Sequence, residues 1–111
     1  GKEQGTIVSR SAKEVAKLNQ EETLRIFDVR KPGEYAASHI RGANQTPLAS
    51  INKHLSKFVA GDNYVHCLGG YRSVIAISIL KSRGIHNLVN ITEGYEQIEQ
   101  ENFDLNKTCQ N

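Results

Sequence analysis

The stretch NYVHCLGGYRSVIAISIL, residues 63–80, decides the fold because a glycine-rich turn joins a short apolar run to a longer one. Tyr64–His66 is short and favours a β-strand. Val74–Leu80 is apolar almost all round, which is typical of a buried helix. This order predicts a strand that ends at Cys67, a tight turn, and a helix that begins at about Arg72 and lies deep in the fold.

The same alternation of strand and helix precedes this stretch. Thr6–Ser9 is β-branched and predicts a strand, and Ser11 with Glu14 forms a capping-box pattern that predicts the start of a helix. Leu24–Val29 predicts a second strand, and Pro32 is well placed in the first turn of a short helix. The unit therefore repeats before the cysteine is reached.

The alternation continues to the end of the chain. Residues 43–46 form a third extended piece, and a helical face follows it, made by Leu48, Ile51, Leu55 and Phe58. Residues 88–91 predict a fifth strand, residues 94–100 predict a last helix, and the tail from residue 103 is expected to fray.

Strands that alternate with helices imply an α/β fold with a central, mainly parallel five-stranded sheet and helices on both faces. With 111 residues and 38% hydrophobic content, we expect a single domain, 1–111, with a core of about 5–102 and a flexible tail, 103–111. Ligands of such sheets bind at the carboxyl ends of the strands, where Cys67 is expected.

Charge and composition narrow the expected partners and location. The sequence has fourteen Lys and Arg residues and twelve Asp and Glu residues, and the basic residues are scattered along it. We therefore expect neither a nucleic-acid nor a membrane partner. No apolar run approaches the roughly 20 residues of a membrane span, and the first residues lack the apolar core of a secretion signal. A cytoplasmic protein with a small substrate is expected, and the Gly1 start leaves room for a fused domain in the native chain.

The residues after Cys67 predict an anion cradle. Gly69 and Gly70 can turn their N–H groups toward the sulfur, while Arg72 and the start of the helix add positive charge. Ser73 can add a hydroxyl hydrogen bond. Such surroundings favour the thiolate form of a cysteine, so we interpret Cys67 as a nucleophile, the alternative being a small buried apolar residue.

Three segments carry a family resemblance. They are FDVRKPGEYAASHIRGANQTPL (residues 27–48), CLGGYRS (67–73) and VNITEGYEQI (89–98), and in order and spacing they resemble the rhodanese-like sulfurtransferases. The sequence departs from the family pattern at Ser38, Arg41, Glu93 and Ile98, where glycine, proline, glycine and tryptophan are usual. None of these departures touches the expected nucleophile.

The resemblance implies a rhodanese-like fold and a double displacement, in which Cys67 takes sulfur from a donor, holds it as a persulfide and passes it to an acceptor. It gives Asp28 and Arg30 a supporting role and requires no metal or organic cofactor. The donor would be a low-molecular-weight persulfide or thiosulfate, and the acceptor a thiol or a cyanide-like nucleophile. The substrate-binding cradle comprises Leu68, Gly69, Gly70, Tyr71, Arg72 and Ser73; because Arg72 is its only cation, we expect weak thiosulfate affinity.

Two other functions remain open. Cysteine phosphatases also place His before Cys and Arg-Ser at the end of the loop, but only four residues separate Cys67 from Arg72, and the phosphatase loop is one residue longer. A non-catalytic rhodanese-like docking or regulatory module is the second alternative.

The end of the chain, which includes Cys109, also fits a module joined to a metallo-β-lactamase-like domain. His39 and His66 lack a regular metal-ligand spacing.

Overall fold

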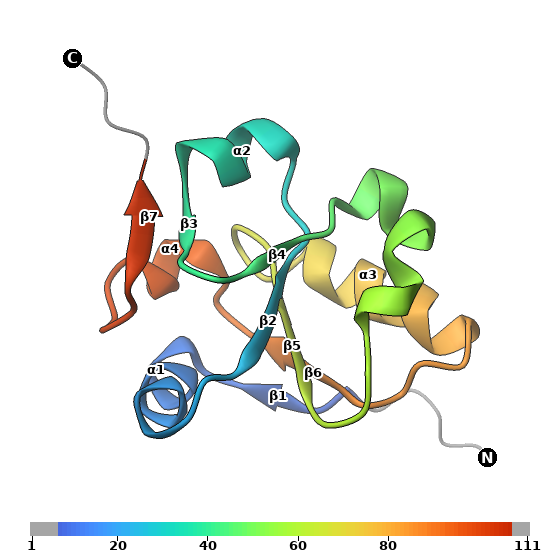
Figure 1. Cartoon of the computed structure of the whole chain (residues 1–111), viewed down its shortest axis with the longest axis horizontal. Helices are drawn as coiled ribbons and strands as arrows, with labels where there is room; N and C mark the ends of the chain where they lie inside the picture. The colour runs from blue at the N-terminus through green and yellow to red at the C-terminus, as the bar shows by residue number, and fades with distance from the viewer. Residues whose placement is uncertain (1–6, 108–111) are drawn as a thin grey trace.

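A five-stranded, all-parallel sheet forms the centre of the protein, and its computed structural model describes residues 7–107 (Figure 1). The strand order is β1-β6-β5-β2-β4, which confirms the predicted α/β fold with a parallel sheet. These strands are β1 (Ser9–Arg10), β2 (Arg25–Asp28), β4 (Asn44–Gln45), β5 (Asn63–His66) and β6 (Leu88–Ile91).

Helices cover both faces of the sheet, as the sequence predicts. They are α1 (Ala12–Glu21), α2 (Pro32–Ala37), the 3₁₀ helix η1 (Leu48–Lys57), α3 (Arg72–Ser82) and α4 (Tyr95–Ile98). One apolar cluster joins α1 and α4 to the sheet, and a second joins η1 and α3 to it. Figure 1 shows α1 at the left of the sheet and α3 with η1 at the right.

The start of α1 shows why the local sequence predicted it. The Ser11 hydroxyl accepts the N–H of Glu14 at 3.1 Å, and the Glu14 carboxylate accepts the N–H of Ser11 at 3.1 Å. These reciprocal bonds satisfy two backbone donors that the first turn leaves free. The capping box is confirmed.

Two helical predictions need correction. The segment Leu48–Lys57 is a 3₁₀ helix with a break at Ser50, so its apolar face is not that of a regular α-helix. Helix α3 is not buried all round, because Val74 and Ile75 are 37% and 40% exposed. Its apolar sequence serves both the core and a surface next to the cysteine loop.

The predicted flexible tail is wrong for residues 103–107. Phe103 is buried, and β7 (Leu105–Lys107) pairs antiparallel with β3 (Ser38–Ile40) in a separate two-stranded sheet. The sequence of residues 105–107 does not by itself predict a strand, because so short a segment becomes a strand only when it can pair with another one, here β3. Cys109 and the predicted strand residue Thr6 lie outside the described residues.

The register of the sheet brings distant polar residues to one edge. Asp28 ends β2 and His66 ends β5, and the two are directly paired. The His66 carbonyl accepts the N–H of Val29 at 3.0 Å. Cys67 therefore follows the central strand at the carboxyl edge, where parallel sheets bind ligands.

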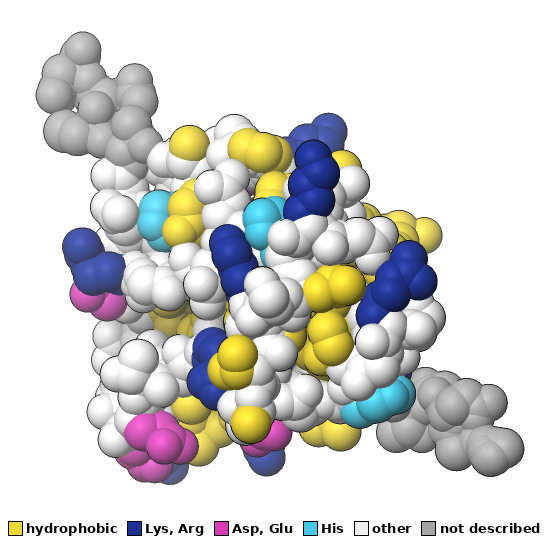
Figure 2. All heavy atoms as spheres, turned by 45° about the vertical axis from the view of Figure 1, so that its right-hand side comes forward, with side chains coloured by type: hydrophobic (Ala, Val, Ile, Leu, Met, Phe, Trp, Pro, Cys, Tyr) yellow, Lys and Arg dark blue, Asp and Glu magenta, His cyan; other side chains and the backbone are white. Residues whose placement is uncertain are grey.

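Charge is unevenly distributed over the surface. Between residues 35 and 92 the sequence has a single acidic residue, Asp62. On the face in Figure 2, Asp and Glu lie toward the left and lower edges, and Lys and Arg form separate groups rather than one continuous patch. Within residues 7–107, no helix combines the length and apolar character needed to cross a membrane.

Candidate active site

Cys67 lies at the carboxyl end of the central strand β5 and is only 1% exposed. Its Sγ atom accepts the N–H of Gly70 at 3.1 Å and lies 3.6 Å from the Ser73 hydroxyl, to which the thiol donates. An N–H that points at a sulfur stabilises negative charge there. The loop thus folds back on the cysteine as the sequence predicts.

The backbone at Gly70 explains why this turn needs glycine. Its φ is +90°, and a Cβ atom at this position would lie 2.0 Å from the Thr92 carbonyl oxygen. Gly69 is different, since a Cβ there would meet Glu96 Oε1 at an ordinary 3.7 Å. The sequence pointed to both glycines, but the steric requirement falls on Gly70.

A second segment clamps the loop from outside. The N–H of Tyr95 donates to the Cys67 carbonyl at 2.7 Å, and the N–H of Glu96 donates to the Leu68 carbonyl at 3.0 Å. Gly94 permits this approach, since its φ is +68° and a Cβ would lie 2.6 Å from the Cys67 oxygen. Residues 94–96 were not among the predicted site residues; the glycine before an aromatic residue was the available signal.

Ser73 connects the sulfur to the neighbouring strand β6. Its hydroxyl donates to Asn90 Oδ1 at 2.7 Å, and both side chains are buried. The Ser73 hydroxyl oxygen in turn accepts a hydrogen bond from the Cys67 thiol. When the sulfur becomes an anion, the hydroxyl can turn to donate to it. Asn90 was not among the predicted site residues.

Arg72 contacts a carboxylate as well as closing the loop. It is the first residue of α3, and its guanidinium donates to Glu34 Oε1 at 2.8 Å and Oε2 at 3.1 Å. This pair lowers the pKa of Glu34 to about 2, with the Arg72 hydrogen bond as the largest cause. The same bond raises the pKa of Arg72. The cation at Arg72 was predicted from the sequence, and its partner Glu34 was not.

Asp28 and Arg30 form a buried ion pair beneath the site. Arg30 Nη2 donates to Asp28 Oδ2 at 2.7 Å and to the Ser38 carbonyl at 2.6 Å. The guanidinium also lies 4.0 Å above the Tyr95 ring, and the Tyr95 hydroxyl hydrogen-bonds the Ser38 side chain. These contacts join the end of β2 to the start of β3 and to α4; a supporting role is the one expected for Asp28 and Arg30.

His66 packs beside this pair at the end of β5. It is fully buried; its Nδ1 lies 3.1 Å from the Cys67 carbonyl and its Nε2 lies 3.7 Å from Asp28 Oδ2. Burial lowers the pKa of His66, so the ring is neutral. His39 stacks on Tyr35. Within residues 7–107, no cluster of three or more His, Cys, Asp and Glu side chains could hold a metal ion.

The side chains of the loop leave an apolar rim around the cysteine. Leu68 and Tyr71 are 38% and 78% exposed, and Val74 and Ile75 follow them on α3. Beside Arg72 lies a pocket of about 230 Å³, lined also by Val29, Lys31, Pro32, Pro47, Leu48 and Ala49. The predicted cradle residues therefore differ in their positions. Gly70 and Ser73 contact the Cys67 sulfur, whereas the Tyr71 side chain is largely exposed.

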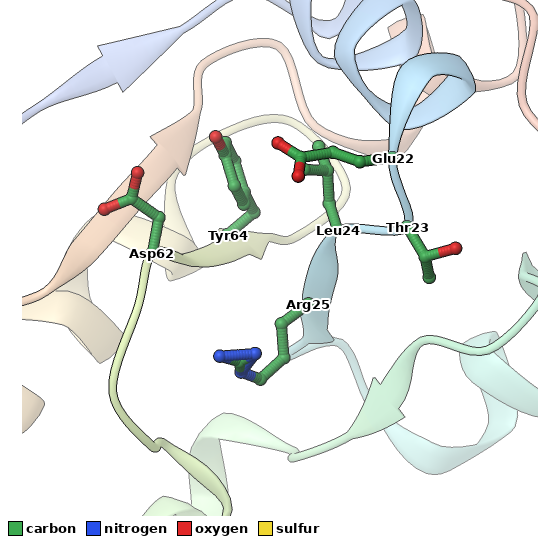
Figure 3. A pocket seen from close by; sticks show the side chains of 6 residues that line it. All are labelled: Glu22, Thr23, Leu24, Arg25, Asp62 and Tyr64. Carbon is green, nitrogen blue, oxygen red and sulfur yellow. The ribbon is translucent and has the colours of Figure 1, made fainter.

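A different pocket lies at the opposite edge of the sheet, at the amino ends of β2 and β5. It measures about 210 Å³ and is lined by Glu22, Thr23, Leu24, Arg25, Asp62 and Tyr64. Figure 3 shows the Tyr64 ring between the carboxylates of Asp62 and Glu22. Since parallel strands run the same way, this pocket is far from the cysteine along the strands.

Comparison with known proteins agrees with this geometry. The model of the Rhodanese-like domain family matches residues 11–101. A Bacillus subtilis protein with the name "Putative sulfur carrier protein YrkF" is 33% identical over 79 residues, which are 70% of this chain and 43% of that protein. The chain thus spans less than half the length of this curated relative.

Solved structures give the same result. A rhodanese-like domain protein from Staphylococcus aureus aligns with a TM-score of 0.78 and 29% identity, covering 88% of this chain and 97% of that chain. The rhodanese-like domain of the Anabaena protein Alr3790 aligns with a TM-score of 0.80 and 22% identity, covering 93% and 81%. The predicted fold is confirmed, and the chain belongs to the rhodanese-like domain family.

Proposed function

We propose that this protein is a sulfurtransferase that carries a sulfane sulfur on Cys67. The observation that supports this most directly is the short contact from the Gly70 N–H to the Cys67 sulfur, within a loop whose shape Gly70 and Gly94 impose. A buried strand-to-helix connection has no structural need for a backbone donor aimed at a sulfur. The arrangement suits a cysteine that carries negative charge during its reaction.

The chemistry proceeds in two displacements. The Cys67 thiolate attacks the outer sulfur of a donor R–S–SH; a new S–S bond forms, the S–S bond of the donor breaks, and its electron pair leaves with the thiolate R–S⁻. An acceptor nucleophile then attacks the outer sulfur of the Cys67 persulfide. The S–S bond breaks, and the Cys67 thiolate is regenerated.

The loop supplies stabilisation for both steps. The Gly70 N–H donates to the cysteine sulfur, which carries negative charge when it attacks the donor and again when the acceptor displaces it. The Ser73 hydroxyl, which donates to Asn90 in the resting thiol, can turn to donate to the same sulfur. Donor and acceptor are small molecules with access to the loop past its exposed apolar rim.

The two carboxylates that pair with an arginine near the loop, Glu34 and Asp28, do not suit the phosphatase alternative. A phosphatase needs a general acid to protonate the leaving oxygen. Glu34 has a pKa of about 2, so it holds no proton at neutral pH. Asp28 is fully buried and accepts hydrogen bonds from Arg30 on both oxygens.

The test is intact-mass measurement after incubation with glutathione persulfide, using the wild type, Cys67→Ser and Cys109→Ser. We expect one added sulfur atom in the wild type and in Cys109→Ser, its removal by a thiol, and none in Cys67→Ser. Cys109→Ser is the matched control for the second thiol. Cys67-dependent hydrolysis of an aryl phosphate without a persulfide would instead favour the phosphatase, and failure of both reactions would favour a docking module.

A further inference from the structure

Glu34 forms an ion pair with Arg72, the cation that a negatively charged sulfur donor would otherwise contact. Its carboxylate accepts two parallel hydrogen bonds from Arg72, at 2.8 and 3.1 Å, and Oε1 also accepts the Lys31 N–H at 2.9 Å. A bidentate carboxylate-guanidinium pair is strong and fixed in geometry. Arg72 therefore meets an incoming donor with its charge already balanced.

The two partners are fixed by separate elements. Glu34 lies in the first turn of α2, where the Lys31 N–H holds its side chain, and Arg72 begins α3 beside the cysteine loop. Their side chains are 30% and 27% exposed, so the pair is partly shielded from water and is screened less than a surface pair. We take this pair, loop residues 68–71 and the pocket beside Arg72 together as the entrance to the site.

The rest of the entrance does not supply a replacement for this cation. Residues 68–71 carry no charge. The pocket beside Arg72 is walled mainly by Val29, Pro32 and Leu48, and Lys31 is the other charged residue that lines it. Lys31 is exposed, and an exposed, hydrated ammonium binds an anion weakly.

We propose that Glu34 is the specificity-determining residue of the site, and that through Arg72 it excludes sulfonate donors such as thiosulfate in favour of donors without negative charge next to the transferred sulfur. This proposal rests on the proposed sulfur transfer. A thiosulfate ion must either approach a carboxylate at contact distance or break both hydrogen bonds of the pair. A persulfide, whose organic part can lie against the apolar pocket, needs neither.

The test compares the ratio of kcat/KM for thiosulfate to kcat/KM for glutathione persulfide in three proteins. Glu34→Gln keeps the shape of the side chain and removes its charge, which frees the Arg72 cation. A unit charge at contact distance in a partly exposed site is worth roughly a factor of ten in affinity. We expect this ratio to rise about tenfold or more, through a lower KM for thiosulfate.

Glu21→Gln is the matched control, because Glu21 is an exposed glutamate at the end of α1, on the other face of the sheet. It makes the same change in net charge, and we expect its ratio to equal that of the wild type. Sulfate should also become a competitive inhibitor in Glu34→Gln, and replacing Arg72 with glutamine in the Glu34→Gln protein should abolish both gains. A merely structural role for Glu34 would produce neither.

The outcomes separate this proposal from the function on which it rests. An unchanged ratio in Glu34→Gln, with glutathione persulfide still loading Cys67, overturns the role of Glu34 and leaves the sulfurtransferase standing. An equal rise in Glu21→Gln also overturns it, because net charge would then be the cause. If neither donor loads Cys67 in any of the proteins, both proposals are overturned. Thermal unfolding of each variant shows that it is folded under the assay conditions.

Discussion

Replacing Gly70 with alanine should destabilise the domain far more than the same change at the adjacent Gly69. Alanine at φ +90° carries the penalty of a left-handed backbone, about 1–2 kcal/mol. Its Cβ would also lie 2.0 Å from the Thr92 oxygen, and real contacts are at least 3.0 Å, so loop and strand end must separate by about 1 Å. Overpacking of this kind costs about 1–3 kcal/mol.

The two terms together predict a loss of about 2–5 kcal/mol in the free energy of unfolding of Gly70→Ala. For a domain of this size, that is a fall of roughly 10 °C or more in melting temperature. Gly69→Ala makes only an ordinary 3.7 Å contact and should change the free energy by less than about 1 kcal/mol. Denaturant unfolding of both variants measures the difference.

A functional readout accompanies the stability measurement. Because the Gly70 N–H donates to the Cys67 sulfur, displacing this peptide should slow sulfur loading of Cys67 even at a temperature where Gly70→Ala is folded. Gly69→Ala should load at nearly the wild-type rate. Equal stability of the two variants would refute the steric reasoning, and equal loading rates would refute the role given to the N–H.

Three further predictions concern the supporting contacts. Asp28→Asn should cost about 3–5 kcal/mol in the free energy of unfolding, because it leaves the Arg30 charge buried without a partner; denaturant unfolding measures it. Gly94→Ala should fall in the same range as Gly70→Ala and should also reduce sulfur loading, because its Cβ would lie 2.5 Å from the Leu68 oxygen. The pKa of Glu34 is lowered from 4.5 to about 2, so its ion pair stabilises the fold fully above about pH 4.5, and this part is lost as pH falls toward 2; Glu34→Gln should lack that loss when unfolding is followed against pH.

Much of the fold could be predicted because local signals and tertiary structure agree. The capping box at Ser11, the strand Leu88–Ile91 and the strand that ends before Cys67 are each encoded within a few residues. Hydrophobic periodicity did not predict burial where the tertiary contacts of a residue determine its exposure. The apolar run of α3 does not distinguish buried Ile77 from exposed Ile75, since both satisfy the same pattern.

The site was predictable where it is contiguous in the chain and not where it is assembled from distant segments. Gly70 and Ser73 follow Cys67 closely, and their residue types indicate their contacts. Glu34 and Asn90 reach the loop from α2 and β6, and each is an ordinary polar residue in its own segment. Pairings over such separations depend on the register of the sheet, which short-range patterns do not specify.

The clamp formed by Tyr95 and Glu96 also makes the cysteine loop depend on a late part of the chain. The loop carbonyls of Cys67 and Leu68 have these partners only when residues 94–96 are in place, directly after β6, which lies between β1 and β5 in the sheet. A chain that ends before residue 94 would therefore lack both backbone donors that hold the loop. Truncation at this point would separate the cysteine from contacts that shape its surroundings.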